Sequence, residues 1–270
     1  MADGTSGALM PAAFIGHGSP MNALETNRYT ESWHAFGESV PKPTAILVVS
    51  AHWYINATAV TAMPRPRTIH DFYGFPQALF DVEYPAPGMP EMAKEISDIV
   101  EPTWVGADLD SWGIDHGTWS VLVHAFPQAD IPVVQLSINA DKGLDYHLEL
   151  GAKLAPLRER GVLIVGSGNV VHNLRAIDRI EGLNARASRP WAQAFDDAVK
   201  NALAARDDMA LVNYARLAGD SAATAVQTPD HYFPFLYALG ASDSLSEKAT
   251  SVFEGFQAGT LSMRCVQFGA

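Results

Sequence analysis

The chain of 270 residues is 48% hydrophobic and 18% charged, and this composition excludes an intrinsically disordered protein. Its formal net charge of −12 would repel a phosphate backbone, so nucleic acid is excluded as an expected partner. The single cysteine, Cys265, excludes an internal disulfide and a thiolate metal cluster. Because this cysteine lies in an apolar run, we expect a buried, inert thiol.

The chain shows no targeting or membrane signal. Its first ten residues lack the basic and apolar regions of a signal peptide, and no apolar stretch is long enough to cross a bilayer. We therefore expect a cytoplasmic protein that makes no membrane contact. The oligomeric state is left open, and an oligomer is compatible with the sequence.

Short apolar runs of strand length recur along the chain. In chain order these runs are Ala12–Gly16, Ala45–Ala51, Pro132–Ile138, Val162–Gly166 and Met263–Phe268. Segments with helical spacing or helix boundary residues lie between them, namely Glu91–Val100, Val121–Phe126, Leu144–Arg160, Trp191–Ala205 and a segment from His231 to Gly240. Residues 64–90, rich in proline, glycine and aromatic residues, are interpreted as a long ordered loop.

This alternation of strands and helices predicts an α/β fold. The expected architecture is a single domain over residues 1–270, with a mostly parallel or mixed central sheet and helices on both faces. In such sheets, ligands bind beyond the carboxyl ends of the strands. We therefore expect the functional site at that edge.

Three histidines come directly after apolar runs, and so should project toward this edge. They are His17, His52 and His172. A neutral imidazole is a ligand for zinc, iron, copper or nickel, and a metal site with an open position is suited to catalysis. A single histidine after a strand is more often structural, but His17 and His52 together favour a metal site, and His231 is a further candidate ligand.

The remaining polar residues receive less specific interpretations. His34 and His124 are expected to be structural, and His147 is expected to be solvated on an amphipathic helix. His70 either approaches the site through its loop or makes a turn contact with Asp71. The carboxylates of Asp196 and Asp197 are expected on an exposed helix face.

Eight sequence blocks resemble the LigB-type class III extradiol dioxygenase superfamily, in its DOPA 4,5-dioxygenase-like branch. These blocks run in the same order through almost the whole chain: Gly16–Met21, Ser50–Trp53, Ile69–Pro76, Tyr84–Gly88, Asp115–Trp119, Pro132–Ser137, Gly166–Leu174 and Asp230–Ala241. The resemblance implies an enzyme that opens the ring of a catechol, such as DOPA or a related small aromatic diol. With O2 as co-substrate, the product would be a muconic semialdehyde.

The resemblance also implies a site. One divalent metal, either Fe(II) or Zn(II), would be held by His17, His52 and His231, whereas the better-studied part of the superfamily has a glutamate as third ligand. His172 would serve as acid/base or as a fourth ligand, and His116 as a second histidine for proton transfer or substrate contact. Ser19, Trp53, Tyr73 and Tyr232 are expected to bind the substrate, with ordinary core packing as the alternative for the aromatic residues.

Two other functions stay open at this point. Three histidines and an open position would also suit a zinc hydrolase acting on an amide or ester. The superfamily further includes regulatory proteins that keep the pocket without ring cleavage.

Overall fold

The computed structural model describes residues 9–177, 187–243 and 247–269. Within these residues, eight strands form one mixed sheet in the order β4-β3-β5-β2-β6-β1-β10-β7. In chain order the strands are β1 (Ala12–Gly16), β2 (Ala45–Ile55), β3 (Ala59–Thr61), β4 (Gly106–Asp108), β5 (Val133–Asn139), β6 (Val162–Gly168), β7 (Ala249–Phe253) and β10 (Cys265–Phe268). The central strands β5, β2, β6 and β1 run parallel to one another, and β10 is antiparallel to β1. A separate pair joins β8 (Phe256–Gln257) to β9 (Leu261–Ser262).

The central strands form because they are apolar on both faces. Successive residues of β2 alternate between two cores: Leu47 and Val49 lie in one, and Ile46 and Val48 lie in the other. A strand that is buried on both sides has a continuous apolar sequence, as a parallel sheet covered by helices requires.

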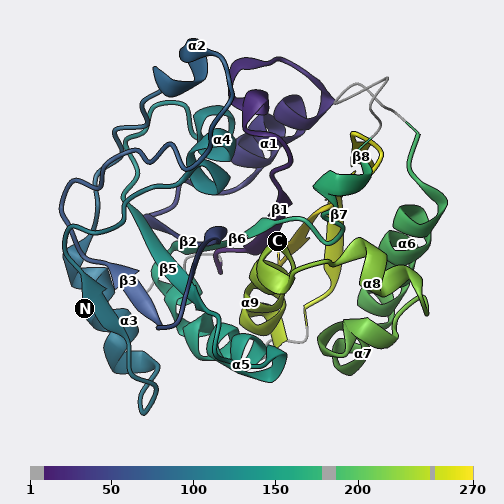
Figure 1. The fold of residues 1–270 in the computed structure, drawn as a ribbon. Helices are drawn as coiled ribbons and strands as arrows, with labels where there is room; N and C mark the ends of the chain where they lie inside the picture. Colours follow the sequence, from purple (N-terminus) through teal and green to yellow (C-terminus); the bar gives the residue numbers. More distant parts are fainter. Residues whose placement is uncertain (1–8, 178–186, 244–246, 270) are drawn as a thin grey trace.

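Helices cover both faces of the sheet (Figure 1). The helices are α1 (Arg28–Ser39), α2 (Gln77–Phe80), α3 (Pro90–Ile99), α4 (His116–Ala125), α5 (Leu144–Leu154), α6 (Pro190–Ala205), α7 (Asp208–Val212), α8 (Ser221–Ala225) and α9 (Phe233–Asp243). Helices α1 and α4 pack on one face, and α3, α5, α6 and α9 contribute to the core on the other. The predicted single α/β domain, with a mixed sheet between helices, is confirmed.

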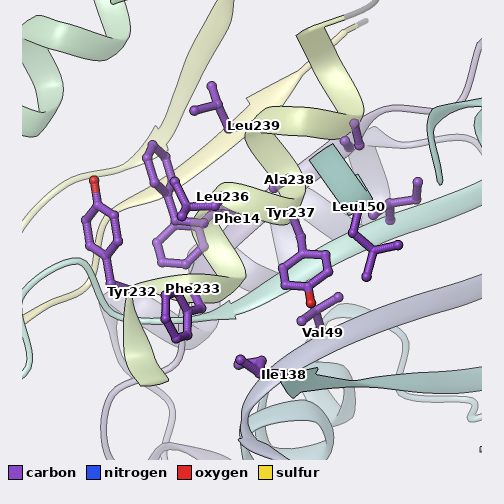
Figure 2. Close-up of a cluster of buried hydrophobic side chains, with 14 of the residues drawn as sticks. Phe14, Val49, Ile138, Leu150, Tyr232, Phe233, Leu236, Tyr237, Ala238 and Leu239 are labelled. Carbon is purple, nitrogen blue, oxygen red and sulfur yellow. The ribbon is translucent and has the colours of Figure 1, made fainter. Parts of the chain in front are cut away.

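Helix α9 anchors the larger core. Its residues Phe233, Leu236 and Tyr237 are buried, and Figure 2 shows them gathered with Phe14 and other side chains of the sheet. The rings of Phe14 and Phe235 meet edge to face with 5.4 Å between their centroids. This packing fixes the amino-terminal end of α9, which begins two residues after His231.

Several element boundaries differ from those predicted. Strand β2 continues to Ile55, so that His52 lies within the strand, at a shift in its register with β5. Helix α4 begins at His116, because Asp115 accepts a hydrogen bond from the backbone N–H of Thr118 and caps the helix. The predicted helix over residues 144–160 is α5 followed by a 3-10 helix, η2 (Ala155–Arg160), and it ends at Gly161, which has the left-handed conformation typical of a helix end.

Two predictions about polar side chains were wrong. His147 is fully buried, and its Nδ1 lies 3.0 Å from the Tyr237 hydroxyl. Asp196 is 2% exposed, because its carboxylate accepts hydrogen bonds from Arg264 and from the hydroxyl of Ser262 inside the fold. The predicted burial of Cys265 is confirmed.

The described helices include none that is both long and apolar enough to span a bilayer.

Candidate metal centre

Five histidines from distant parts of the chain meet at the carboxyl edge of the central strands. His17 follows β1, His52 lies near the end of β2, and His172 comes four residues after β6. His116 is the first residue of α4, and His231 ends the 3-10 helix η6 (Pro229–His231). All five are buried or nearly so. The convergence that the sequence analysis requires is therefore present.

Three of these rings form a nearly equilateral triangle. The ring centroids are 5.1 Å apart for His17 and His52, 5.3 Å for His17 and His231, and 5.2 Å for His52 and His231. Tetrahedral coordination with nitrogen–metal bonds of about 2.1 Å places ligand nitrogens roughly 3.4 Å apart and imidazole centroids roughly 5 Å apart. The Nε2 atoms of His17 and His52 are 3.2 Å apart. This spacing fits a shared metal ion.

The protonation pattern of His17 can be derived from its partners. Its Nδ1 lies 3.0 Å from the Ser167 hydroxyl, and that hydroxyl donates its only hydrogen to the backbone carbonyl of Gly117. His17 must therefore be the donor at Nδ1, which leaves a lone pair on Nε2. Burial and then the neighbouring histidines hold the pKa of His17 well below its usual value.

Asp71 sets the same pattern in two further rings. One carboxylate oxygen lies 3.1 Å from Nδ1 of His52, and the other lies 2.8 Å from Nδ1 of His116 and accepts its backbone N–H. Both rings donate from Nδ1 and keep the Nε2 lone pair. Burial lowers the pKa of His52, but the hydrogen bond to Asp71 and nearby carboxylates outweigh it and raise the pKa overall. Despite burial, the same contacts hold the pKa of Asp71 far below its usual value.

Asp230 is the hydrogen-bond acceptor that sets the tautomer of His231. Its carboxylate accepts a short hydrogen bond from Nδ1 of His231, so this third Nε2 also carries a lone pair. The pKa of His231 is lowered, since burial outweighs the effect of the carboxylate. The Nε2 atoms of His17 and His52 thus face each other with no proton between them. A cation between these lone pairs would satisfy both, and the donor set therefore fits a divalent metal.

His116 gives an alternative third ligand. The nearest ligand atoms of His17, His52 and His116 all lie within 4.8 Å of one another. The ring centroid of His116, however, is 3.8 Å from that of His52 and 6.0 Å from that of His17, which is uneven for a shared ion. The triangle with His231 is the more regular one by ring centroids, but among the described residues only His17, His52 and His116 bring their ligand atoms within 4.8 Å of one another.

His172 lies beside the triangle. Its ring stacks on that of His231 with 3.5 Å between centroids and 4° between planes. Burial, followed by the charge of His231, lowers the pKa of His172 to about 2. The ring is thus neutral at working pH. Within the described part of the chain, its ring nitrogens take part in no hydrogen bond, so they are free to act on a bound molecule.

The other candidate residues differ in their surroundings. Ser19 is nearly buried, and its hydroxyl accepts the backbone N–H of Met21 to cap a 3-10 helix, η1 (Pro20–Leu24). Trp53 is buried and stacks on Trp112 with 5.8 Å between centroids. Tyr73 is 92% exposed, on the loop that carries Asp71. Tyr232 lies fully in the core and donates to the carbonyl of Leu211.

The end of β6 supports two corners of the triangle. The carbonyl of Gly168 accepts the N–H of His17, and the N–H of Asn169 donates to the carbonyl of His231. A Cβ atom on Gly168 would lie only 2.2 Å from the carbonyl oxygen of His231, so the close approach requires glycine.

The sequence analysis missed the partners of the ligand rings. Asp71 was considered only as a turn contact of His70, but His70 instead contacts the Val82 carbonyl through Nε2. Asp230 directly precedes its histidine, and an acidic neighbour was the one local signal available. Ser167 lies within the block Gly166–Leu174, but the sequence analysis gave it no role.

Known proteins that resemble this chain are ring-opening dioxygenases. A family model described as "Catalytic LigB subunit of aromatic ring-opening dioxygenase" matches residues 12–264. The chain belongs to this family. Membership of the LigB family confirms the predicted enzyme class, an extradiol dioxygenase.

Individual LigB-type relatives cover nearly the whole chain. A protein of Escherichia coli K12 named "4,5-DOPA dioxygenase extradiol" is 49% identical over 98% of this chain and 96% of its own length. A protein of the same name from Beta vulgaris is 36% identical over 94% of this chain and 95% of its own. A crystal structure of an uncharacterised protein from Escherichia coli K12 superposes with a TM-score of 0.82 at 44% identity, covering 96% of this chain and all of that one.

Proposed function

We propose that the chain cleaves the ring of a catechol, DOPA or a related dihydroxy-aromatic compound, next to its two hydroxyl groups. O2 would be the second substrate and a muconic semialdehyde the product. The observation that carries the proposal is the triangle of His17, His52 and His231, in which each ring donates from Nδ1 and keeps a lone pair on Nε2. The names of the relatives support the substrate class.

The proposed ligands of one divalent metal are His17, His52 and His231, with His172 as a possible fourth. Three neutral imidazoles suit Fe(II) or Zn(II), and ring cleavage calls for Fe(II). When bound, the metal would act as a Lewis acid that lowers the pKa of the substrate hydroxyls and orients the reactants. Asp71, Asp230 and Ser167 keep the three rings in the tautomer that binding requires.

His116 is proposed as the base that takes a proton from a substrate hydroxyl. Its Nδ1–H donates to Asp71, so Nε2 is the free acceptor, and the carboxylate stabilises the imidazolium that forms. Neutral His172, whose ring stacks on His231, is suited to the same proton transfer. Contact of Ser19, Trp53, Tyr73 or Tyr232 with substrate stays a prediction, and of these Tyr73 is the exposed one.

Metal analysis and a catechol assay test the proposal together. Protein purified without added metal should contain one divalent ion per chain, and after loading with Fe(II) it should yield a yellow ring-fission product in air but none under argon. His17→Ala should lose both the metal and ring cleavage while keeping its fold by circular dichroism. Full activity in that variant would contradict the proposal.

The same assay separates the two rival functions. Hydrolysis of an amide or ester that proceeds equally under argon would point to a zinc hydrolase. Metal binding without any ring-fission product across a catechol panel would point to a regulatory protein. The expected cytoplasmic location remains a prediction for fractionation of cells.

A further inference from the structure

A hollow of about 370 Å³ opens beside the candidate metal centre. It is lined by His172, Leu174, Arg175, Ala223, Gln227 and Thr228. His172 belongs to both places, because it lines this hollow and its ring stacks on His231. Since His172 borders both, the hollow is the neighbouring space for the far end of a molecule bound at the histidines.

The chemistry of the hollow is set by one charged residue. Arg175 lies on an exposed 3-10 helix, η3 (Leu174–Ala176), three residues after His172. No carboxylate is among the residues that line the hollow. Within the described residues, Arg175 takes part in no ion pair or side-chain hydrogen bond, although the chain has 30 acidic residues and only 18 Lys and Arg residues.

An arginine in this setting favours one kind of ligand. A guanidinium presents its N–H groups in a planar fork that matches a carboxylate with two parallel hydrogen bonds. Gln227 and Thr228 add neutral polar groups to the lining, and Leu174, which is 58% exposed, adds apolar surface for a carbon chain. An ammonium group would instead be repelled by Arg175.

We propose that the hollow is a subsite for the side chain of the substrate and that Arg175 binds a carboxylate at its end. The inference rests on the proposed function, since the diol end would lie at the histidines. It adds that the preferred substrates are catechols with an anionic chain. The carboxylate is the group that is recognised, and an amine on the same chain is dispensable.

A pair of matched substrates tests this in the Fe(II)-loaded enzyme. The compounds are 3-(3,4-dihydroxyphenyl)propionate and 4-ethylcatechol, which share the ring and chain but differ in the carboxylate. We expect the wild type to favour the carboxylate compound in kcat/KM by about fivefold to tenfold, the effect of one partly exposed charge-assisted pair. Arg175→Gln should remove this preference mainly through KM. Arg175→Glu should instead raise kcat/KM for dopamine, a catechol whose chain ends in an ammonium group, above that for the carboxylate compound.

The matched control is Arg160→Ala. Arg160 comes just before β6, at the opposite edge of the sheet, and its guanidinium pairs with Glu95. This variant should keep the wild-type preference. A wild-type enzyme without preference, or an Arg175→Gln variant with an unchanged one, would overturn the inference.

Equilibrium binding under argon keeps the inference separate from the proposed function. Calorimetric titration of the metal-loaded protein with the same two compounds needs no turnover. A tighter Kd for the carboxylate compound that disappears in Arg175→Gln supports the subsite even if no ring is opened. Equal Kd values for the two compounds in the wild type would refute it even if both rings are opened.

Discussion

Replacing Asp71 with asparagine should weaken metal binding without removing any proposed ligand. Asp71 offers two acceptor oxygens to two Nδ1–H donors, on His52 at 3.1 Å and on His116 at 2.8 Å. Asparagine offers only one acceptor oxygen, and its other terminal group is a donor. One ring must then lose its partner or move its proton to Nε2, where the lone pair is needed.

The size of the effect follows from these contacts. Loss of a hydrogen-bond partner behind a metal-bound histidine typically costs about 10-fold to 100-fold in metal affinity, or roughly 1.4–2.7 kcal/mol. A hydrogen bond to a charged group is worth about 1.5–3 kcal/mol, which agrees with that range. Since His52 and His116 share the carboxylate, we expect the loss in Asp71→Asn to reach at least tenfold.

A competition titration with a chromophoric chelator measures this affinity. Asp81→Asn is the matched control, because Asp81 lies exposed near the same loop and its side chain accepts a hydrogen bond from Gln77, which lies on the surface. Affinities that agree within twofold between the two variants would refute the reasoning about the tautomers. Nitrogen NMR of the ring atoms would report the proton position directly.

Three further changes test packing, pH dependence and the close approach of β6. Asp196→Ala should lower the free energy of unfolding by about 3–5 kcal/mol in urea, because it leaves the buried charge of Arg264 without its main partner. Burial lowers the pKa of His147 from 6.5 to about 4, so stability present above pH 6.5 is lost as pH falls toward 4. Between pH 8 and pH 5, the wild type should lose about 2 kcal/mol more than His147→Gln in urea titrations. Gly168→Ala should weaken metal binding at least tenfold, since the His231 carbonyl must retreat by about 0.8 Å, more than the tolerance of about 0.2 Å in metal–ligand distances.

Each of these changes has a control and a contrary outcome. Asp197→Asn alters the exposed neighbour of Asp196 and should change stability by less than about 0.5 kcal/mol. Gly143→Ala adds a methyl group where no heavy atom lies within 4 Å, and metal affinity should stay at the wild-type value. Equal stability losses in Asp196→Ala and Asp197→Asn, equal pH slopes with and without His147, or wild-type metal affinity in Gly168→Ala would each contradict its prediction.

The fold could be predicted where burial leaves a regular pattern in the sequence. Strand β2 was found because Val48 and Val49 face opposite cores and must both be apolar. Strands β3 and β4 have only three residues each, too few to show any period. His147 and Asp196 were misassigned because their partners, Tyr237 and Arg264, lie 90 and 68 residues away. Local polarity cannot reveal such pairs.

In the candidate site, too, some features could be predicted from the sequence and others depend on distant partners. The positions of His17 and His52 near strand ends place them at one edge by topology alone. The tautomer of each ring depends on a partner, and Asp71 reaches His52 and His116 only through the path of a loop in three dimensions. That partner could not be inferred from spacing, whereas Asp230 next to His231 could.

The end of β6 attaches the candidate metal centre to the middle of the sheet. It holds His17 through one hydrogen bond and His231 through another, although these histidines are 214 positions apart in the chain. Fraying of the outer loops leaves both anchors in place, and releasing either one means detaching the chain from the middle of the sheet. Metal binding and cooperative folding of the domain are thereby linked, so a bound ion should raise the free energy of unfolding of the whole sheet.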